Sequence, residues 1–206
     1  MTTTLFLLAA TAMLTTSMNA ADCCAKAAPH SCCSAAAPTS APLSDKSVYQ
    51  LDGAWTSDKG KTIELSSLKG RPVVVAMFFA RCQYACRLLV YKLKQIEAAL
   101  PANIRGNVDF LLVTFDTERD TPAELATYRT QHELGTQWTL LHGDAGQVQD
   151  FAAVLGIKYK QDAQGQFSHS NVLTLLDASG QIAYQEPGLT LGADEMVRRI
   201  EKTVKP

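Results

Sequence analysis

Two long apolar runs predict strands that are buried on both faces. The segment RPVVVAMFFA at 71–80 is almost continuously apolar, and VDFLLVTF at 108–115 repeats the pattern. Runs of this length without polar alternation are typical of the central strands of a parallel sheet. Two shorter segments extend the prediction: WTLLHG at 138–143 indicates a short strand, and NVLTLLDASGQIAY at 171–184 indicates a hairpin around the turn DASG.

Between these strands the apolar positions recur with the period of an α-helix. Residues 87–100 carry Leu and Ile side chains on one stripe, which ends before a proline. The segment DTPAELATYRTQHEL at 120–134 has Thr121 in position to cap a helix, with a capping-box glutamate three residues later. Two further helices are predicted at 144–156 and 194–204.

The predicted elements together specify a fold class. Val48–Leu51 and Thr62–Leu65 are expected to form an N-terminal hairpin, with SDKG as its turn. The full order is then β-β-α-β-α-β-α-β-β-α. Parallel strands joined by crossover helices predict an α/β three-layer sandwich with a central mixed sheet, to which the N-terminal hairpin is an extension.

The first 47 residues differ in composition from the rest. An apolar stretch at 5–16, followed by small residues, predicts a signal peptide over 1–20 and therefore export. An ordinary buried helix is the alternative, because no Lys or Arg precedes the stretch. Residues 21–47 are rich in Ala, Ser, Pro and Cys, so we expect a flexible tether. The folded domain is expected at 48–206, without a stable membrane span apart from an uncleaved leader.

Net charge and cysteine content limit the classes of function that the chain can have. The formal net charge is −1, which gives no indication of nucleic acid or an anionic membrane surface as a partner. The chain has 6 cysteines, and they stand in close pairs. That pattern suits an oxidising compartment, a metal, or both.

Cys82 and Cys86 lie where the strand at 71–80 gives way to a helix, in the stretch MFFARCQYACRLLV. If the helix starts near Gln83, both thiols lie at its first turn, and residues four apart share a face with Cβ atoms about 5–6 Å apart. The free N–H groups of a helix start stabilise a thiolate, which is the nucleophile of disulfide exchange and a ligand for soft metals. The alternatives are a structural disulfide or two inert core thiols.

Three segments resemble the SCO/SenC family of thioredoxin-fold proteins: LSSLKGRPVVVAMFFARCQYAC, VTFDTERDTPAELATY and FSHSNVLTLLDASGQI. The resemblance spans residues 51–202, nearly all of the expected domain. It implies a thioredoxin-like fold and a copper site made by the Cys-x-x-x-Cys pair and a distant histidine, here Cys82, Cys86 and His169. It also implies that Asp116 and Asp120 lie on a loop near that site.

The chain departs from the family pattern at three positions near the cysteines. Gln83 and Arg87 follow the two cysteines where the family usually has proline, and Ala80 stands where it usually has threonine. These changes leave the implied ligands intact. They bear on the loop geometry, the redox potential and the choice of client.

The resemblance implies a periplasmic copper chaperone that delivers copper to the binuclear copper centre of cytochrome c oxidase. The expected partner is an oxidase subunit or another periplasmic copper protein, and the chain is either free or tethered by its leader. The alternative is a thiol–disulfide oxidoreductase that keeps a client's copper-ligand cysteines reduced. The chemistry agrees with copper, because two thiolates and an imidazole suit Cu(I), and Cu(II) accepts the same set with water or a carboxylate added.

A second cluster stands in the predicted tether. CCAKAAPHSCC contains Cys23, Cys24, His30, Cys32 and Cys33, which could bind Cu(I) or another soft ion. The alternatives are disulfides within the cluster, or thiols that react with the Cys-x-x-x-Cys pair.

Two other histidines have no such support. His132 is expected on the solvated face of a helix, and His142 at the end of a strand.

Overall fold

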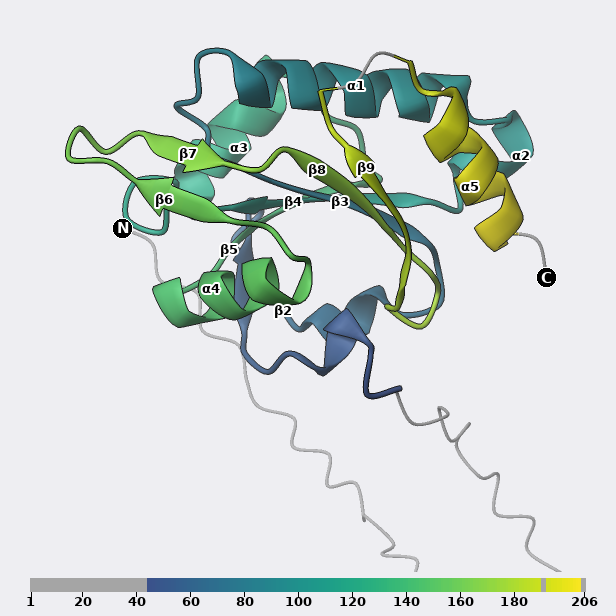
Figure 1. Ribbon diagram of the computed structural model, residues 1–206, viewed down its shortest axis with the longest axis horizontal. Helices are drawn as coiled ribbons and strands as arrows, with labels where there is room; N and C mark the ends of the chain where they lie inside the picture. Colours follow the sequence, from purple (N-terminus) through teal and green to yellow (C-terminus); the bar gives the residue numbers. More distant parts are fainter. Residues whose placement is uncertain (1–43, 190–191, 205–206) are drawn as a thin grey trace, which may run out of the picture. The chain divides into compact units, whose positions relative to one another are not determined.

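The computed structural model describes residues 44–189 and 192–204. A seven-stranded mixed sheet runs through it in the order β2-β1-β5-β4-β3-β8-β9 (Figure 1). The central mixed sheet predicted from the sequence is therefore confirmed. The strands are β1 (Trp55–Ser57), β2 (Thr62–Ile63), β3 (Val73–Phe78), β4 (Asp109–Thr114), β5 (Trp138–His142), β8 (Val172–Leu176) and β9 (Ile182–Pro187).

The centre of the sheet is parallel and fully buried. β3 pairs with β4, and β4 with β5, both in parallel register. Every residue of β3 is buried, which explains why its sequence is apolar throughout rather than alternating. β8 and β9 add antiparallel strands on the other side of β3, as the predicted hairpin requires.

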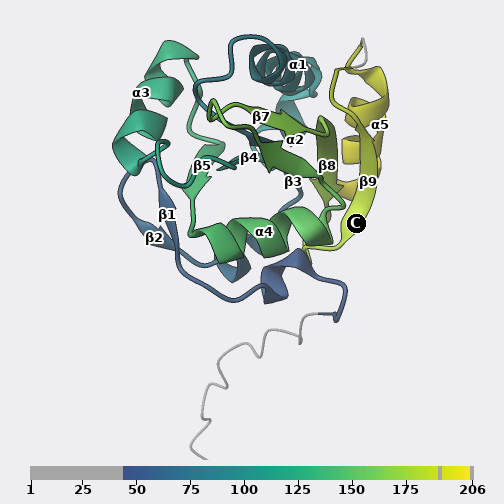
Figure 2. The ribbon, with the colours of Figure 1, turned by 60° about the vertical axis from the view of Figure 1, so that its left-hand side comes forward.

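Helices cover both faces of the sheet (Figures 1 and 2). α1 (Ala85–Ala99), α3 (Pro122–Gln131) and α5 (Asp194–Val204) lie on one side, and α4 (Ala145–Val154) lies on the other. The predicted caps form: the Thr121 hydroxyl accepts the Glu124 N–H, and Asp144 and Gln147 make a reciprocal capping box. Three short helical segments remain: the 3-10 helices η1 (Val48–Gln50) and η2 (Leu65–Leu68), and the α-helix α2 (Ala102–Arg105).

The predicted first strand at Val48–Leu51 is wrong. Val48–Gln50 forms the 3-10 turn η1, and the hairpin partner of β2 is β1 instead. The apolar Val48 and Tyr49 are buried against the β8–β9 turn, where the Val48 N–H donates to the carbonyl of Gly180. Gly180 has φ +82°, and a Cβ there would meet the Tyr49 ring at 2.5 Å. A tertiary contact thus explains apolar residues that the sequence pattern assigned to a strand.

The sequence analysis also missed a hairpin. β6 (Tyr159–Gln161) and β7 (Phe167–His169) pair antiparallel and form a small sheet of their own. Both strands are short, and six polar or aromatic residues give no apolar run of the kind that marked the central strands. The omission matters because β7 ends at His169.

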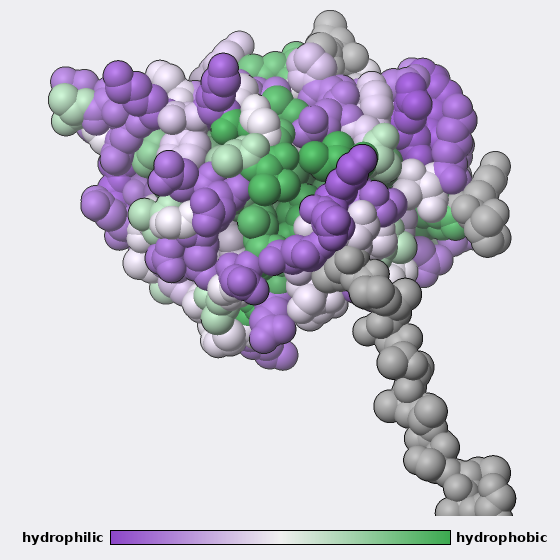
Figure 3. Space-filling model, turned by 60° about the horizontal axis from the view of Figure 1, so that its bottom comes forward, coloured by the Kyte–Doolittle hydropathy of each residue, from purple (hydrophilic) through white to green (hydrophobic). Residues whose placement is uncertain are grey.

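Figure 3 shows the face on the side of α4, away from α1. A band of apolar residues there is enclosed by polar ones. No helix in the part of the chain that the structure describes is long and apolar enough to cross a bilayer. The predicted signal peptide at 1–20 and all but the last residues of the predicted tether lie outside the described residues.

Candidate functional site

The cysteine pair lies at the start of α1. After β3 the chain turns, with the Cys82 N–H donating to the Phe79 carbonyl at 3.1 Å, and the helix begins at Ala85. The N-cap residue, Tyr84, has no side-chain cap hydrogen bond. Instead the Cys86 N–H donates to Cys82 Sγ at 3.2 Å. The Cys82 sulfur therefore satisfies one of the free amides that every helix start presents.

His169 is brought to the pair by the β6–β7 hairpin. Its Nε2 lies 3.7 Å from Cys86 Sγ, although the two residues are 83 positions apart in the sequence. The ring packs against Phe115, with centroids 4.9 Å apart, and edge-on to Phe79 at 6.2 Å. Nδ1 faces the Ser170 carbonyl at 3.4 Å. This contact leaves Nε2 directed at the thiol.

Burial distinguishes the two thiols. Cys86 is 1% exposed and Cys82 is half-buried, and both are free cysteines. Burial raises the pKa of Cys86 because the charged thiolate loses its hydration, while a backbone hydrogen bond from Phe79 acts in the opposite direction. Burial also lowers the pKa of His169, which keeps the imidazole in the neutral form that binds metals.

The three side chains do not yet form a complete cage. Among residues 44–189 and 192–204, no group of three His, Cys, Asp or Glu side chains is already arranged around a common metal position. Cys86 and His169 face each other, whereas the Cys82 sulfur accepts a helix amide.

Asp116 and Asp120 lie behind the site, as expected, on the loop after β4. Both are 1% exposed. Asp120 Oδ2 accepts the Ala80 N–H at 2.8 Å and the Thr114 hydroxyl at 2.5 Å, and its Oδ1 is buried without a hydrogen-bond partner. Burial raises the pKa of Asp120. Asp116 pairs with Arg119 at 2.5 Å. Asp120 therefore bonds to the loop that carries the thiols, while Asp116 bonds to Arg119, which donates to Gly165 in the hairpin that carries His169.

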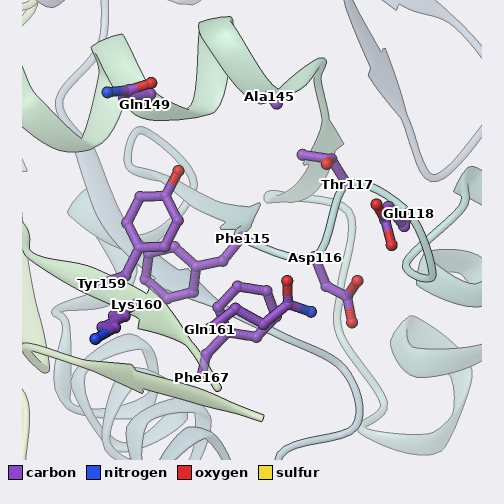
Figure 4. Close-up of a pocket in the computed structure, with 10 residues that line it drawn as sticks. All are labelled: Phe115, Asp116, Thr117, Glu118, Ala145, Gln149, Tyr159, Lys160, Gln161 and Phe167. Atoms are coloured by element: carbon purple, nitrogen blue, oxygen red, sulfur yellow. The ribbon is translucent and has the colours of Figure 1, made fainter. Parts of the chain in front are cut away.

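A cleft of about 420 Å³ lies beside the β6–β7 hairpin (Figure 4). It lies between the β6–β7 hairpin, the segment after β4 and the start of α4. The rings of Phe115, Tyr159 and Phe167 gather on one side of it, and the Asp116 carboxylate lies beyond them. Because Phe115 also contacts the His169 ring, the cleft and the candidate site share a wall.

The other histidines lie elsewhere. His142 ends β5 as predicted, and its Nδ1 is 3.1 Å from the Asp120 carbonyl. His132 was expected to be solvated, but it is half-buried at the end of α3, with its ring 4.1 Å from the ring of Tyr128. Burial lowers the pKa of His132, and the nearby cations Arg87 and Lys94 add to the effect. The second cluster, Cys23, Cys24, His30, Cys32 and Cys33, lies outside the described residues.

Comparison with known proteins decides the family. The SCO1/SenC family model matches residues 45–205, most of the chain. The chain belongs to the SCO1/SenC family. Its predicted thioredoxin-like fold is that of solved Sco proteins.

Individual relatives of this SCO1/SenC chain are distant. A Stutzerimonas stutzeri protein, provisionally named a copper-binding protein, is 28% identical over 142 residues, which are 67% of this chain and 68% of the relative. Copper-bound ScoI of Bradyrhizobium japonicum shares the fold with a TM-score of 0.64 at 20% identity, covering 73% of this chain and 96% of that one. BsSco, a cytochrome c oxidase assembly protein in which a disulfide switch was identified, has a TM-score of 0.64 at 18% identity, covering 74% and 92%.

Proposed function

We propose that this SCO1/SenC protein is a copper chaperone that binds copper through Cys82, Cys86 and His169. The client would be a cytochrome c oxidase subunit, with the binuclear copper centre as the destination, or another periplasmic copper protein. The observation that carries the proposal is the 3.7 Å approach of His169 Nε2 to Cys86 Sγ beside a second free thiol. Copper-bound relatives with the same fold support it.

The donor set fits the cargo. Two thiolates and a neutral imidazole are soft and borderline ligands, which favour Cu(I), and a carboxylate or water could complete a Cu(II) site. Each thiol must lose its proton when it binds the metal. Cys86 and His169 are held by buried neighbours, while Cys82 is partly exposed. We therefore expect a client's ligand to approach the ion next to Cys82, and the ion to leave from there.

A thiol–disulfide oxidoreductase is the second candidate. Both cysteines are free thiols, and the disulfide switch of BsSco shows such chemistry in a protein of the same fold. In this reaction the dithiol would become a Cys82–Cys86 disulfide, and its two electrons and two protons would convert a client disulfide into two thiols. The same oxidation would remove both thiolate ligands, so the redox state would control copper binding.

Replacing His169 with alanine separates the two functions. We expect Cu(I) affinity to fall on the order of a hundredfold, because one of three ligands is lost. The reduction potential of the dithiol should change little, since the imidazole forms no part of the disulfide. Competition titration against a Cu(I) chelator, with the potential measured in parallel, gives both values.

His132→Ala is the matched control, because it removes another half-buried imidazole, one that packs on Tyr128 of α3. Unchanged copper affinity in His169→Ala would count against the chaperone. A reduction potential too high to reduce a client would count against the oxidoreductase.

We also propose that the protein is exported to the periplasm by its leader at 1–20, and that the tether at 21–47 carries a second copper cluster. Replacing Cys23, Cys24, Cys32 and Cys33 with serine in the full chain is expected to lower Cu(I) stoichiometry from about two ions to about one. Metal analysis after dialysis measures the ratio. A stoichiometry that does not change would remove the second cluster from the proposal.

A further inference from the structure

The element that carries the candidate histidine is held to the domain by side-chain contacts rather than by strand pairing. β6 and β7 pair with each other and not with the main sheet. An isolated two-stranded hairpin is only marginally stable in water, so its position depends on its contacts with the rest of the domain. One fastening is aromatic: Phe167 packs on Phe79 and Phe115, with centroids 5.2 and 6.1 Å apart. This packing fixes the Phe167 ring, but the tip of the hairpin must be held by other contacts.

Arg119 fastens the tip. Its Nε donates to Asp116 Oδ2 at 2.5 Å, and its backbone N–H donates to Asp116 Oδ1 at 3.2 Å. Its Nη2 donates to the carbonyl of Gly165, in the turn between β6 and β7. Gly165 has φ +76°, and a Cβ there would meet Arg119 Nη1 at 2.6 Å. The turn is therefore shaped so that the guanidinium lies directly against its backbone.

The same loop holds the cysteine turn from its other end. Asp120 Oδ2 accepts the N–H of Ala80, two residues before Cys82, and the hydroxyl of Thr114 from β4. Asp116 is in turn tied to β4, since its N–H donates to the Thr114 hydroxyl at 3.0 Å. A single segment thus bonds to the loop with the thiols and to the hairpin with the imidazole, and its two aspartates are buried.

We propose that the segment 116–120 is a brace that sets the separation of His169 from the cysteine pair, with Arg119 as its positioning residue. The proposal rests on the copper-binding function proposed above. Arg119 need not touch copper. It acts by holding the Gly165 carbonyl, and through the short hairpin it holds the imidazole that ends β7.

The first test uses the metal-free protein, so it does not depend on copper. Arg119→Ala should raise amide hydrogen exchange in 159–169 by about tenfold or more, relative to the core strands β3 and β4, because the tip loses its anchor. Arg129→Ala is the matched control. Arg129 also pairs with an aspartate, Asp58, and donates to backbone carbonyls, but those belong to Gly135 and Trp138. It should leave exchange in the hairpin unchanged.

The second test is a double-mutant cycle in the full chain with Cys23, Cys24, Cys32 and Cys33 replaced by serine. Arg119→Ala should weaken Cu(I) binding by about tenfold or more, as for other partners that orient a ligand. In the His169→Ala background the same change should have no further effect, because there is no imidazole left to position. With Cu(II), pulsed EPR should show weaker modulation from the remote imidazole nitrogen in Arg119→Ala.

Arg119→Lys provides the conservative comparison. A single ammonium can reach Asp116 or the Gly165 carbonyl, but it lacks the guanidinium fork that reaches both. We expect copper affinity and hairpin exchange between those of the wild type and Arg119→Ala.

The outcomes separate the two proposals. Unchanged hairpin exchange in Arg119→Ala overturns the brace, whatever copper does. An affinity loss of equal size in the presence and absence of His169 also overturns it, because Arg119 would then act on the whole domain. If His169→Ala alone has no effect on copper, the copper site fails, while faster hairpin exchange in Arg119→Ala would still support the brace.

Discussion

Replacing Cys86 with serine is expected to weaken Cu(I) binding on the order of a thousandfold. Structural zinc sites bind their ion with about 10–16 kcal/mol, or roughly 3–4 kcal/mol for each of four ligands, and we expect a similar share for a thiolate on Cu(I), which a hydroxyl cannot replace. Cys86 is also the thiol that approaches the His169 imidazole. Its loss therefore removes one of the three proposed ligands, the one that His169 faces. Chelator competition in the tether-serine chain measures the change without interference from the other cysteines.

Controls keep this result interpretable. Serine is nearly isosteric with cysteine, but burying its hydroxyl costs about 1–3 kcal/mol, so denaturant unfolding must accompany the titration. Cys82→Ser should produce a similar loss of affinity with a smaller loss of stability, because Cys82 is half-buried and Cys86 is fully buried. If Cys86→Ser retained tight binding while Cys82→Ser did not, the ion would lie outside the Cys86–His169 pair.

The largest expected effect on stability lies farther along α1. Lys92 Nζ is 2.7 Å from Glu186 Oε1, with the two side chains only 5% and 10% exposed. Lys92→Met should lower the free energy of unfolding by roughly 3–5 kcal/mol, because it leaves the Glu186 carboxylate buried without its cation. Urea denaturation followed by circular dichroism gives the value. The pair joins α1 to the edge strand β9, so the helix that carries Cys86 loses a lateral anchor.

The double variant Lys92→Met with Glu186→Leu tests the reason. Removing both charges should restore most of the lost stability, since a buried pair can often be replaced by apolar residues at little cost. Exposed Arg198, which pairs with Glu195, is the matched control, and Arg198→Met should change stability far less than Lys92→Met. Equal losses in the single and double variants would mean that packing of the Lys92 stem, rather than charge, holds the two elements together.

Sequence patterns predicted the parts of the fold that are periodic over long stretches. β3 and β4 appeared as apolar runs because both of their faces are buried, and the caps at Thr121 and Asp144 are local interactions within one turn of chain. The patterns failed where stability comes from distant partners. Val48 and Tyr49 are apolar because they pack on the β8–β9 turn, and β6 and β7 are too short and polar to show a period.

The hairpin has one signal in its sequence. Between β6 and β7 lies DAQG, with Asp162 accepting turn amides and Gly165 at positive φ, which is typical of a hairpin turn. Arg119 had no comparable signal. The residues next to Arg119 in the sequence do not indicate that it contacts the Gly165 turn.

By itself the sequence determined the α/β class, the position of the central strands and the placement of two thiols at the start of a helix. Spacing and apolar periodicity encode these features, because they depend on residues within a few turns of one another. Only the tertiary structure decided that His169 meets Cys86 across 83 positions, and that the loop at 116–120 bonds to both of their segments. Such contacts follow from the order of strands in the sheet and the burial around the thiols, which no local pattern contains.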